Sequence, residues 1–182
     1  MKRIDYFLRN WRYSVVDSFI PRGCELLDIG GFDGSFLLYV YNKISRGVCI
    51  DPLIEENRDG KIEFLKARVT DKLPFPASSF DVISMIAVFE HLAEYRKIIV
   101  SECFRILKMK GFVILTVPSS SVDNILKILV KMKLIDGMSL EEHSHFRTKE
   151  TVEIFETCGF QLKRWVKFQL HLNNLFIFEK TN

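Results

Sequence analysis

The sequence lacks the features that define several common protein classes. Its four cysteines lie within or at the ends of apolar segments, without the paired spacing of a metal site: Cys24, Cys49, Cys103 and Cys158. We therefore expect buried free thiols, a reducing compartment and no metal site. No uninterrupted apolar run approaches the roughly 20 residues of a membrane-spanning helix. Charged residues interrupt the first segment, MKRIDYFLRN, so it lacks the apolar region that a secretory signal peptide needs. The sequence therefore predicts a cytoplasmic protein.

A strong charge imbalance is also missing. The 182 residues carry a formal net charge of +3, which by itself gives no argument for a nucleic-acid partner. Internal repeats, low-complexity tracts and domain linkers are absent from the sequence. With 48% hydrophobic residues, the chain can bury a substantial core. We expect a single domain over residues 1–182, present as a monomer or a homodimer.

Strand and helix patterns alternate along the chain. Helices are predicted at 2–19 (within an N-terminal helical segment, 1–21), 36–41, 95–107, 119–137 and 148–157. Strands are predicted at 24–29, 47–51, 62–65, 80–88, 112–117, 160–168 and 172–178. This alternation predicts a parallel sheet with helices on both faces. The last two strands are too close for a crossover helix, so we expect an antiparallel hairpin there. Two roles stay open for the first helix, packing across the sheet or covering the substrate.

The most informative stretch is LLDIGGFDGSF, residues 26–36. A strand, a glycine-rich turn and a helix in this order are typical of a nucleotide-binding unit. The dinucleotide fingerprint is not met, because Phe32 and Ser35 stand where it needs glycines. The carboxylate of Asp28 would also repel a pyrophosphate at the start of the helix. It favours a ligand whose nearby groups are hydroxyls or cations, which counts against a dehydrogenase.

Asp51 closes the second predicted strand. A doubly wound fold places an acid there against the ribose hydroxyls of a nucleotide. One carboxylate can accept hydrogen bonds from two vicinal hydroxyls. The alternative is an acid that caps a turn at the end of the strand.

Five segments, in this order, resemble class I S-adenosylmethionine-dependent methyltransferases. They are LLDIGGFDGSF, Asp51, LPFPASSFDVISMIAVFEHL, LKMKGFVILTVP and HFRTKETVEIFETCGF. The resemblance covers about residues 22–180 and is greatest to small enzymes of the ubiquinone/menaquinone-biosynthesis and generic type. It implies a Rossmann-like three-layer α/β sandwich, with a seven-stranded, mostly parallel sheet and an antiparallel last strand. It also implies transfer of a methyl group from S-adenosylmethionine to a small-molecule or lipid-like acceptor.

The resemblance further implies which residues bind the cofactor. The methionine end would lie against Asp28 and the backbone of Gly30, Gly31 and Gly34. Asp51 would bind the ribose, and Pro52 or Leu53 would pack on an adenine face. The segment Val69–Thr70 would follow the adenine edge, and Ile86 and Ala87 would face the cofactor near the sulfonium.

Two positions depart from the family pattern. Phe32 replaces the middle glycine, so its side chain must point away from the cofactor or partly fill the pocket. Val69 stands where many relatives have an acid that accepts a hydrogen bond from the adenine amino group. Here Asp71 or a backbone carbonyl would accept that hydrogen bond instead. These departures motivate an alternative, a catalytically weak cofactor-binding partner subunit. A protein or nucleic-acid methyltransferase is a further alternative, although AVFEHL replaces the Asn/Asp-Pro-Pro-Tyr motif of many DNA and RNA enzymes.

Methyl transfer needs the nucleophile, the methyl carbon and the sulfur to be aligned. It needs a base only if the acceptor must lose a proton. His91 and His143 are the candidate catalytic residues, with His145 beside the second. A structural role stays open for each: His91 as a helix-start residue bonded to backbone, His143 in a surface turn. Residues 119–142 are predicted to form a helical insert over the acceptor site. Its apolar stripe would cover a hydrophobic acceptor, pack as ordinary core or form a dimer face.

Overall fold

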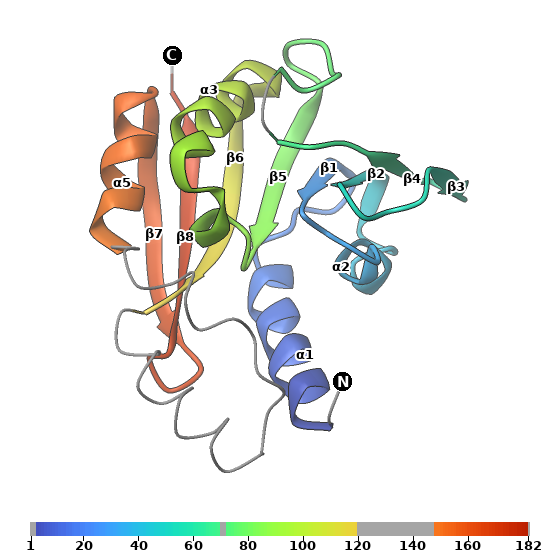
Figure 1. Ribbon diagram of the computed structural model, residues 1–182, viewed down its shortest axis with the longest axis horizontal. Helices are drawn as coiled ribbons and strands as arrows, with labels where there is room; N and C mark the ends of the chain where they lie inside the picture. The colour runs from blue at the N-terminus through green and yellow to red at the C-terminus, as the bar shows by residue number, and fades with distance from the viewer. Residues whose placement is uncertain (1–2, 70–71, 120–147, 182) are drawn as a thin grey trace.

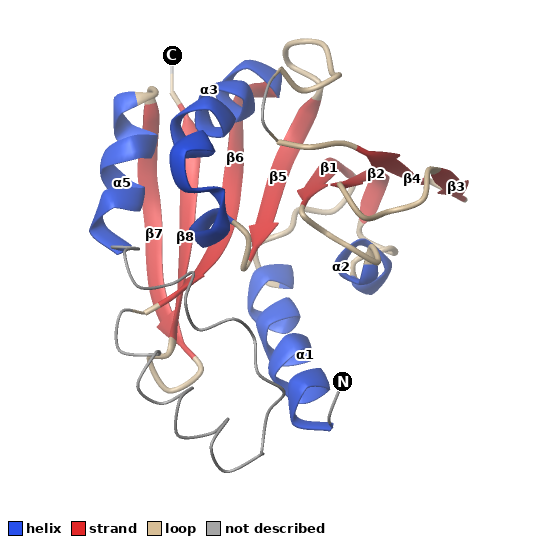
Figure 2. Ribbon diagram, viewed as in Figure 1, coloured by secondary structure: helices blue, strands red, loops and turns tan. Residues whose placement is uncertain are grey.

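The computed structural model describes residues 3–69, 72–119 and 148–181, and its centre is a twisted sheet (Figure 1). The strands are β1 Cys24–Ile29, β2 Ile44–Asp51, β3 Asn57–Asp59, β4 Ile62–Lys66, β5 Phe80–Ile86, β6 Leu107–Pro118, β7 Phe160–Phe168 and β8 Asn173–Lys180. The helices are α1 Arg3–Asp17, α2 Ser35–Tyr39, α3 Arg96–Ile106 and α5 Thr148–Thr157, with a 3₁₀ segment, η1, at Phe89–Tyr95. Figure 2 shows how the helices flank the sheet. None of these helices is long and apolar enough to cross a membrane.

The strand order β3-β4-β2-β1-β5-β6-β8-β7 confirms the predicted Rossmann-like arrangement. Strands β4, β2, β1, β5 and β6 are mutually parallel, and β8 runs antiparallel between β6 and β7. The described sheet has eight strands, one more than the seven predicted. The additional strand, β3, pairs antiparallel with β4 at the edge of the sheet. Its three residues, Asn-Arg-Asp, are polar and exposed, and so carry no hydrophobic pattern.

The start of β6 was predicted wrongly. The strand was expected at 112–117, but β6 begins at Leu107, so residues 108–111 belong to the strand. Lys110 has a φ of 62°, and the register with β5 shifts across this stretch. The extra residues are therefore absorbed as a bulge within the strand instead of ending it.

Each face of the sheet has its own core. Along β1, Leu26 contributes to the core beneath α1 and α2, and Leu27 to the core beneath α3 and α5. Both are fully buried, because successive side chains of a strand point to opposite faces. On the α5 side, the rings of Phe155 and Phe178 stack 4.1 Å apart. The two cores together give the predicted three layers.

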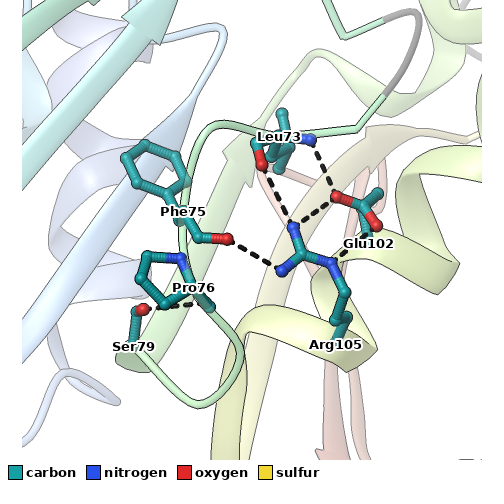
Figure 3. A network of polar contacts seen from close by, with 6 residues as sticks. All are labelled: Leu73, Phe75, Pro76, Ser79, Glu102 and Arg105. Atoms are coloured by element: carbon teal, nitrogen blue, oxygen red, sulfur yellow. Dashed lines mark hydrogen bonds and ion pairs between the residues drawn. The ribbon is translucent and has the colours of Figure 1, made fainter.

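A polar network fixes the loop between β4 and β5 to α3 (Figure 3). The Arg105 guanidinium donates to the carbonyl oxygens of Leu73 and Phe75 at 3.1 and 2.8 Å. Glu102 accepts from the Leu73 backbone N–H at 2.7 Å and pairs with Arg105 at 2.6 Å. The Leu73 side chain is buried, so its backbone groups need these protein partners. The network holds in place the loop that the family resemblance assigns to the adenine edge.

Candidate functional site

A cavity of about 210 Å³ opens where the carboxyl ends of β1 and β5 meet α1. This is the edge of an open α/β sheet where ligands bind. Side chains and backbone from α1, β1, the glycine turn, α2 and β5 surround it. They belong to Arg9, Arg12, Tyr13, Asp28, Gly30, Gly31, Phe32, Asp33, Ser35, Phe36 and Ile86.

Asp28 is the buried acid of this cavity, with 2% of its surface exposed. The Ser84 hydroxyl donates to its Oδ1 at 2.6 Å. Burial raises the pKa of Asp28 to about 7, the hydrogen bond from Ser84 opposes that rise, and the charges of Asp33 and Asp51 add to it. A carboxyl group in this position gains most from a ligand that brings a positive charge.

The glycines of the turn have two different functions. A side chain at Gly31 would collide with the Asp28 carboxylate and the Cys49 sulfur, so only bare backbone fits beside the acid. Gly34 precedes α2 with a φ of 67°, and a side chain there would collide with the Phe64 ring. Gly34 therefore allows α2 to pack on the sheet, and its contact with the cofactor stays a prediction.

Phe32 does not fill the cavity. Its side chain is 58% exposed at the rim, and its backbone adopts the left-handed conformation with a φ of 45°. Its N–H donates to Oδ2 of Asp51 at 3.2 Å, and the Leu53 N–H donates to Oδ1 at 2.8 Å. Each oxygen of Asp51 has a further lone pair, so the carboxylate can still accept from a diol.

The cavity brings together four of the predicted cofactor residues: Asp28, Gly30, Gly31 and Ile86. Asp51 is linked to its rim through Phe32. The others lie outside its lining: Gly34 beneath α2, Pro52 on the surface after β2, Val69 packed on the core, and Ala87, whose N–H bonds to Thr116. Thr70, His143 and all of the predicted insert except Ser119 lie outside the described residues.

His91 stands in η1 with an exposed side chain, and its backbone N–H donates to the Val88 carbonyl at 2.9 Å. It does not belong to the lining of the cavity. Its catalytic role therefore stays a prediction.

Two arginines that line the cavity, Arg9 and Arg12 of α1, were not predicted from the sequence. Arg9 lies 3.5 Å from Asp33 and contacts the Tyr13 ring face. The Nε atoms of Arg9 and Arg12 are buried without a hydrogen-bond partner. Burial lowers the pKa of Arg12, and the charge of Glu90 opposes this. Their i, i+3 spacing predicts that both arginines lie on the same face of the helix. The spacing does not tell that this face covers the cavity.

Comparison with known proteins agrees with this geometry. Residues 27–115 match the family model described as a methyltransferase domain. A chain in the complex of the Haloferax volcanii Trm112 methyltransferase activator with a methyltransferase superposes with a TM-score of 0.75 and 17% identity, covering 96% of this chain and 91% of that one. An S-adenosylmethionine-dependent methyltransferase from Methanosarcina mazei superposes with a TM-score of 0.67 and 23% identity, covering 92% of this chain and 97% of that one. Another from Aquifex aeolicus superposes with a TM-score of 0.71 and 19% identity, covering 93% of this chain and 89% of that one.

Residues 27–115 therefore match a methyltransferase domain, and the chain shares the fold of known S-adenosylmethionine-dependent methyltransferases. The match favours an enzyme of the methyltransferase class, and the fold agrees with S-adenosylmethionine as its cofactor. No curated protein matches this chain. The matched residues begin at β1, so α1 and its arginines lie outside the matched part.

Proposed function

We propose that this chain methylates a small-molecule acceptor, and that its cavity binds the amino-acid end of S-adenosylmethionine. The observation that carries this proposal is the charge pattern of the cavity. One wall has the buried carboxyl group of Asp28, and α1 supplies the guanidinium groups of Arg9 and Arg12. The amino-acid end of the cofactor has one ammonium and one carboxylate, which such walls complement.

The adenosine would lie beyond Phe32, along the carboxyl end of β2. Asp51 would accept from the ribose hydroxyls. Leu53, which is 75% exposed on the following loop, would supply an apolar surface for the adenine ring together with Pro52. Val69, on the loop held by Arg105, would border the ring edge. Binding the ring would cover apolar surface that is open to solvent in this structure.

The protein's contribution to the reaction would be mainly alignment. Bound S-adenosylmethionine supplies a methyl group activated by the positive charge on its sulfur. Ile86, at the end of β5, places an apolar side chain beside the cavity and would keep water from that group. Holding the two reactants in line can contribute about 7–11 kcal/mol to lowering the barrier.

Calorimetric titration with S-adenosylhomocysteine tests this proposal in the wild type, Asp51→Asn and the matched control Asp59→Asn. Asp59 is an exposed acid on β3, remote from the cavity lining. We expect binding by the wild type and the control. Asp51→Asn should bind at least roughly tenfold more weakly, because a charged acceptor is lost from two hydrogen bonds. Equal affinity in all three proteins would contradict the ribose assignment, and no binding by the wild type would contradict the proposed function.

A second candidate function is that of a cofactor-binding subunit that needs a partner for activity. It is supported by the likeness to a chain from a complex with a methyltransferase activator. Binding of S-adenosylhomocysteine without turnover by the isolated chain would favour this candidate. Turnover by the isolated chain would exclude it. A hydrophobic acceptor of the ubiquinone or menaquinone type remains part of the proposal.

A further inference from the structure

Phe32 carries two costs that a glycine at this position would avoid. Its φ of 45° lies in the left-handed region, which is strained for a bulky side chain. It belongs to the lining of the cavity, yet 58% of its surface is exposed, so the ring gains little from burial. A strained residue beside a cavity points to a function, because ligand binding can offset a cost that the protein alone bears.

The turn places Phe32 between the two acids of the site. On one side, a side chain at the neighbouring Gly31 would collide with the Asp28 carboxylate, so the turn passes directly beside that acid. On the other side, the Phe32 N–H donates to Oδ2 of Asp51 at 3.2 Å. A ligand that reaches from Asp28 to Asp51 must therefore pass residue 32.

Under the proposed function, the atoms that pass Phe32 are those around the sulfonium. The sulfur of S-adenosylmethionine joins the amino-acid end, assigned to Asp28, to the ribose, assigned to Asp51. A sulfonium is a cation with apolar carbon substituents, and it has no proton to donate in a hydrogen bond. The face of an aromatic ring attracts such a cation when the two lie within about 6 Å of each other.

We propose that the Phe32 ring covers the bound sulfonium and attracts its positive charge, so that the protein prefers S-adenosylmethionine over S-adenosylhomocysteine. This inference rests on the proposed function and adds a residue that determines cofactor specificity. Methyl transfer turns the charged sulfonium into a neutral thioether, so the attraction ends when the product forms. The ring therefore favours replacement of the product by a fresh cofactor.

The preference of the wild type alone does not identify the ring, because Asp28 and Asp51 also attract a cation. Phe32→Leu separates the contributions. Leucine keeps the backbone N–H that binds Asp51, keeps an apolar side chain at the opening and leaves both acids in place. It removes only the aromatic face.

Calorimetric titration with S-adenosylmethionine, S-adenosylhomocysteine and sinefungin measures the preference. Sinefungin has a charged amine on a carbon atom in place of the methylated sulfur. We expect Phe32→Leu to bind S-adenosylmethionine and sinefungin roughly three- to thirtyfold more weakly than the wild type, with the affinity for S-adenosylhomocysteine within about twofold. Phe32→Trp retains an aromatic face and should keep the preference for the charged compounds.

Lys110→Gly is the matched control for the strained backbone. Lys110 is exposed, has a φ of 62° and lies near the start of β6, outside the cavity lining. Glycine relieves the left-handed strain both there and in Phe32→Gly. Only Phe32→Gly should lose the preference for the charged cofactor.

Three results would overturn the proposal. They are an unchanged affinity for S-adenosylmethionine in Phe32→Leu, equal losses there for S-adenosylmethionine and S-adenosylhomocysteine, or loss of the preference in Phe32→Trp. Equal losses would mean that the side chain is a wall without a preference for charge. No binding of S-adenosylhomocysteine by the wild type would instead refute the proposed function.

Discussion

Asp28 should make the protein less stable as the pH rises. The pKa of Asp28 is about 7 in the folded chain, against an ordinary value of 3.8. Its protonated form is therefore favoured by folding, and this stabilisation is complete below pH 3.8 and lost as the pH rises through about 7. The difference is about three units, which corresponds to about 4 kcal/mol at alkaline pH. Asp28→Asn cannot ionise, and its amide oxygen can still accept from Ser84.

Denaturant unfolding of the wild type and Asp28→Asn at about pH 5 and about pH 8 measures this effect. The variant should be more stable than the wild type at the higher pH, by up to about 4 kcal/mol, with a smaller difference at the lower pH. Glu90 also has a raised pKa, but it is present in both proteins, so the difference isolates Asp28. Asp59→Asn is the control, since Asp59 is an exposed acid on β3 and does not act on Asp28. The same pH dependence in wild type and Asp28→Asn would refute the reasoning.

Two further predictions concern the turn and the loop. Phe32→Gly should stabilise the fold by about 1 kcal/mol, because glycine removes the left-handed strain at a φ of 45° and the exposed ring contributes little burial. Denaturant unfolding measures this change. A loss of more than about 1 kcal/mol would contradict the prediction and show that the ring packs against the protein. Arg105→Ala should destabilise by about 2 kcal/mol, because two backbone carbonyls and Glu102 lose their donor. Lys97→Ala, exposed on the same helix, is the control, and equal effects would refute the role of the network.

The buried strands were predictable because their residues carry the pattern locally. Leu26 and Leu27 continue an apolar run that ends at an acid, and β1 forms there as expected. The antiparallel pair β7 and β8 followed from the short connection between two β-type runs. β3 was not predictable, since its three residues are exposed and polar and pair only because β4 offers an edge.

The site was predictable only where one local segment builds it. Asp28 and Gly31 meet within the same turn, so their proximity follows from the sequence. Arg12 and Asp28 belong to separate elements, and only the packing of α1 beside the end of β1 brings them to the same cavity. Their burial is likewise a tertiary property, because nothing in the local sequence tells which face of a helix will cover a cavity.

Calorimetry that compares S-adenosylhomocysteine with methylthioadenosine tests the central claim most directly. Methylthioadenosine has the same adenosine but lacks the amino-acid end, which is the part assigned to Asp28, Arg9 and Arg12. We expect S-adenosylhomocysteine to bind at least roughly tenfold more tightly, since one charge-assisted contact contributes about 1.5–3 kcal/mol. Equal affinity for the two compounds would contradict the assignment of this cavity to the amino-acid end of the cofactor.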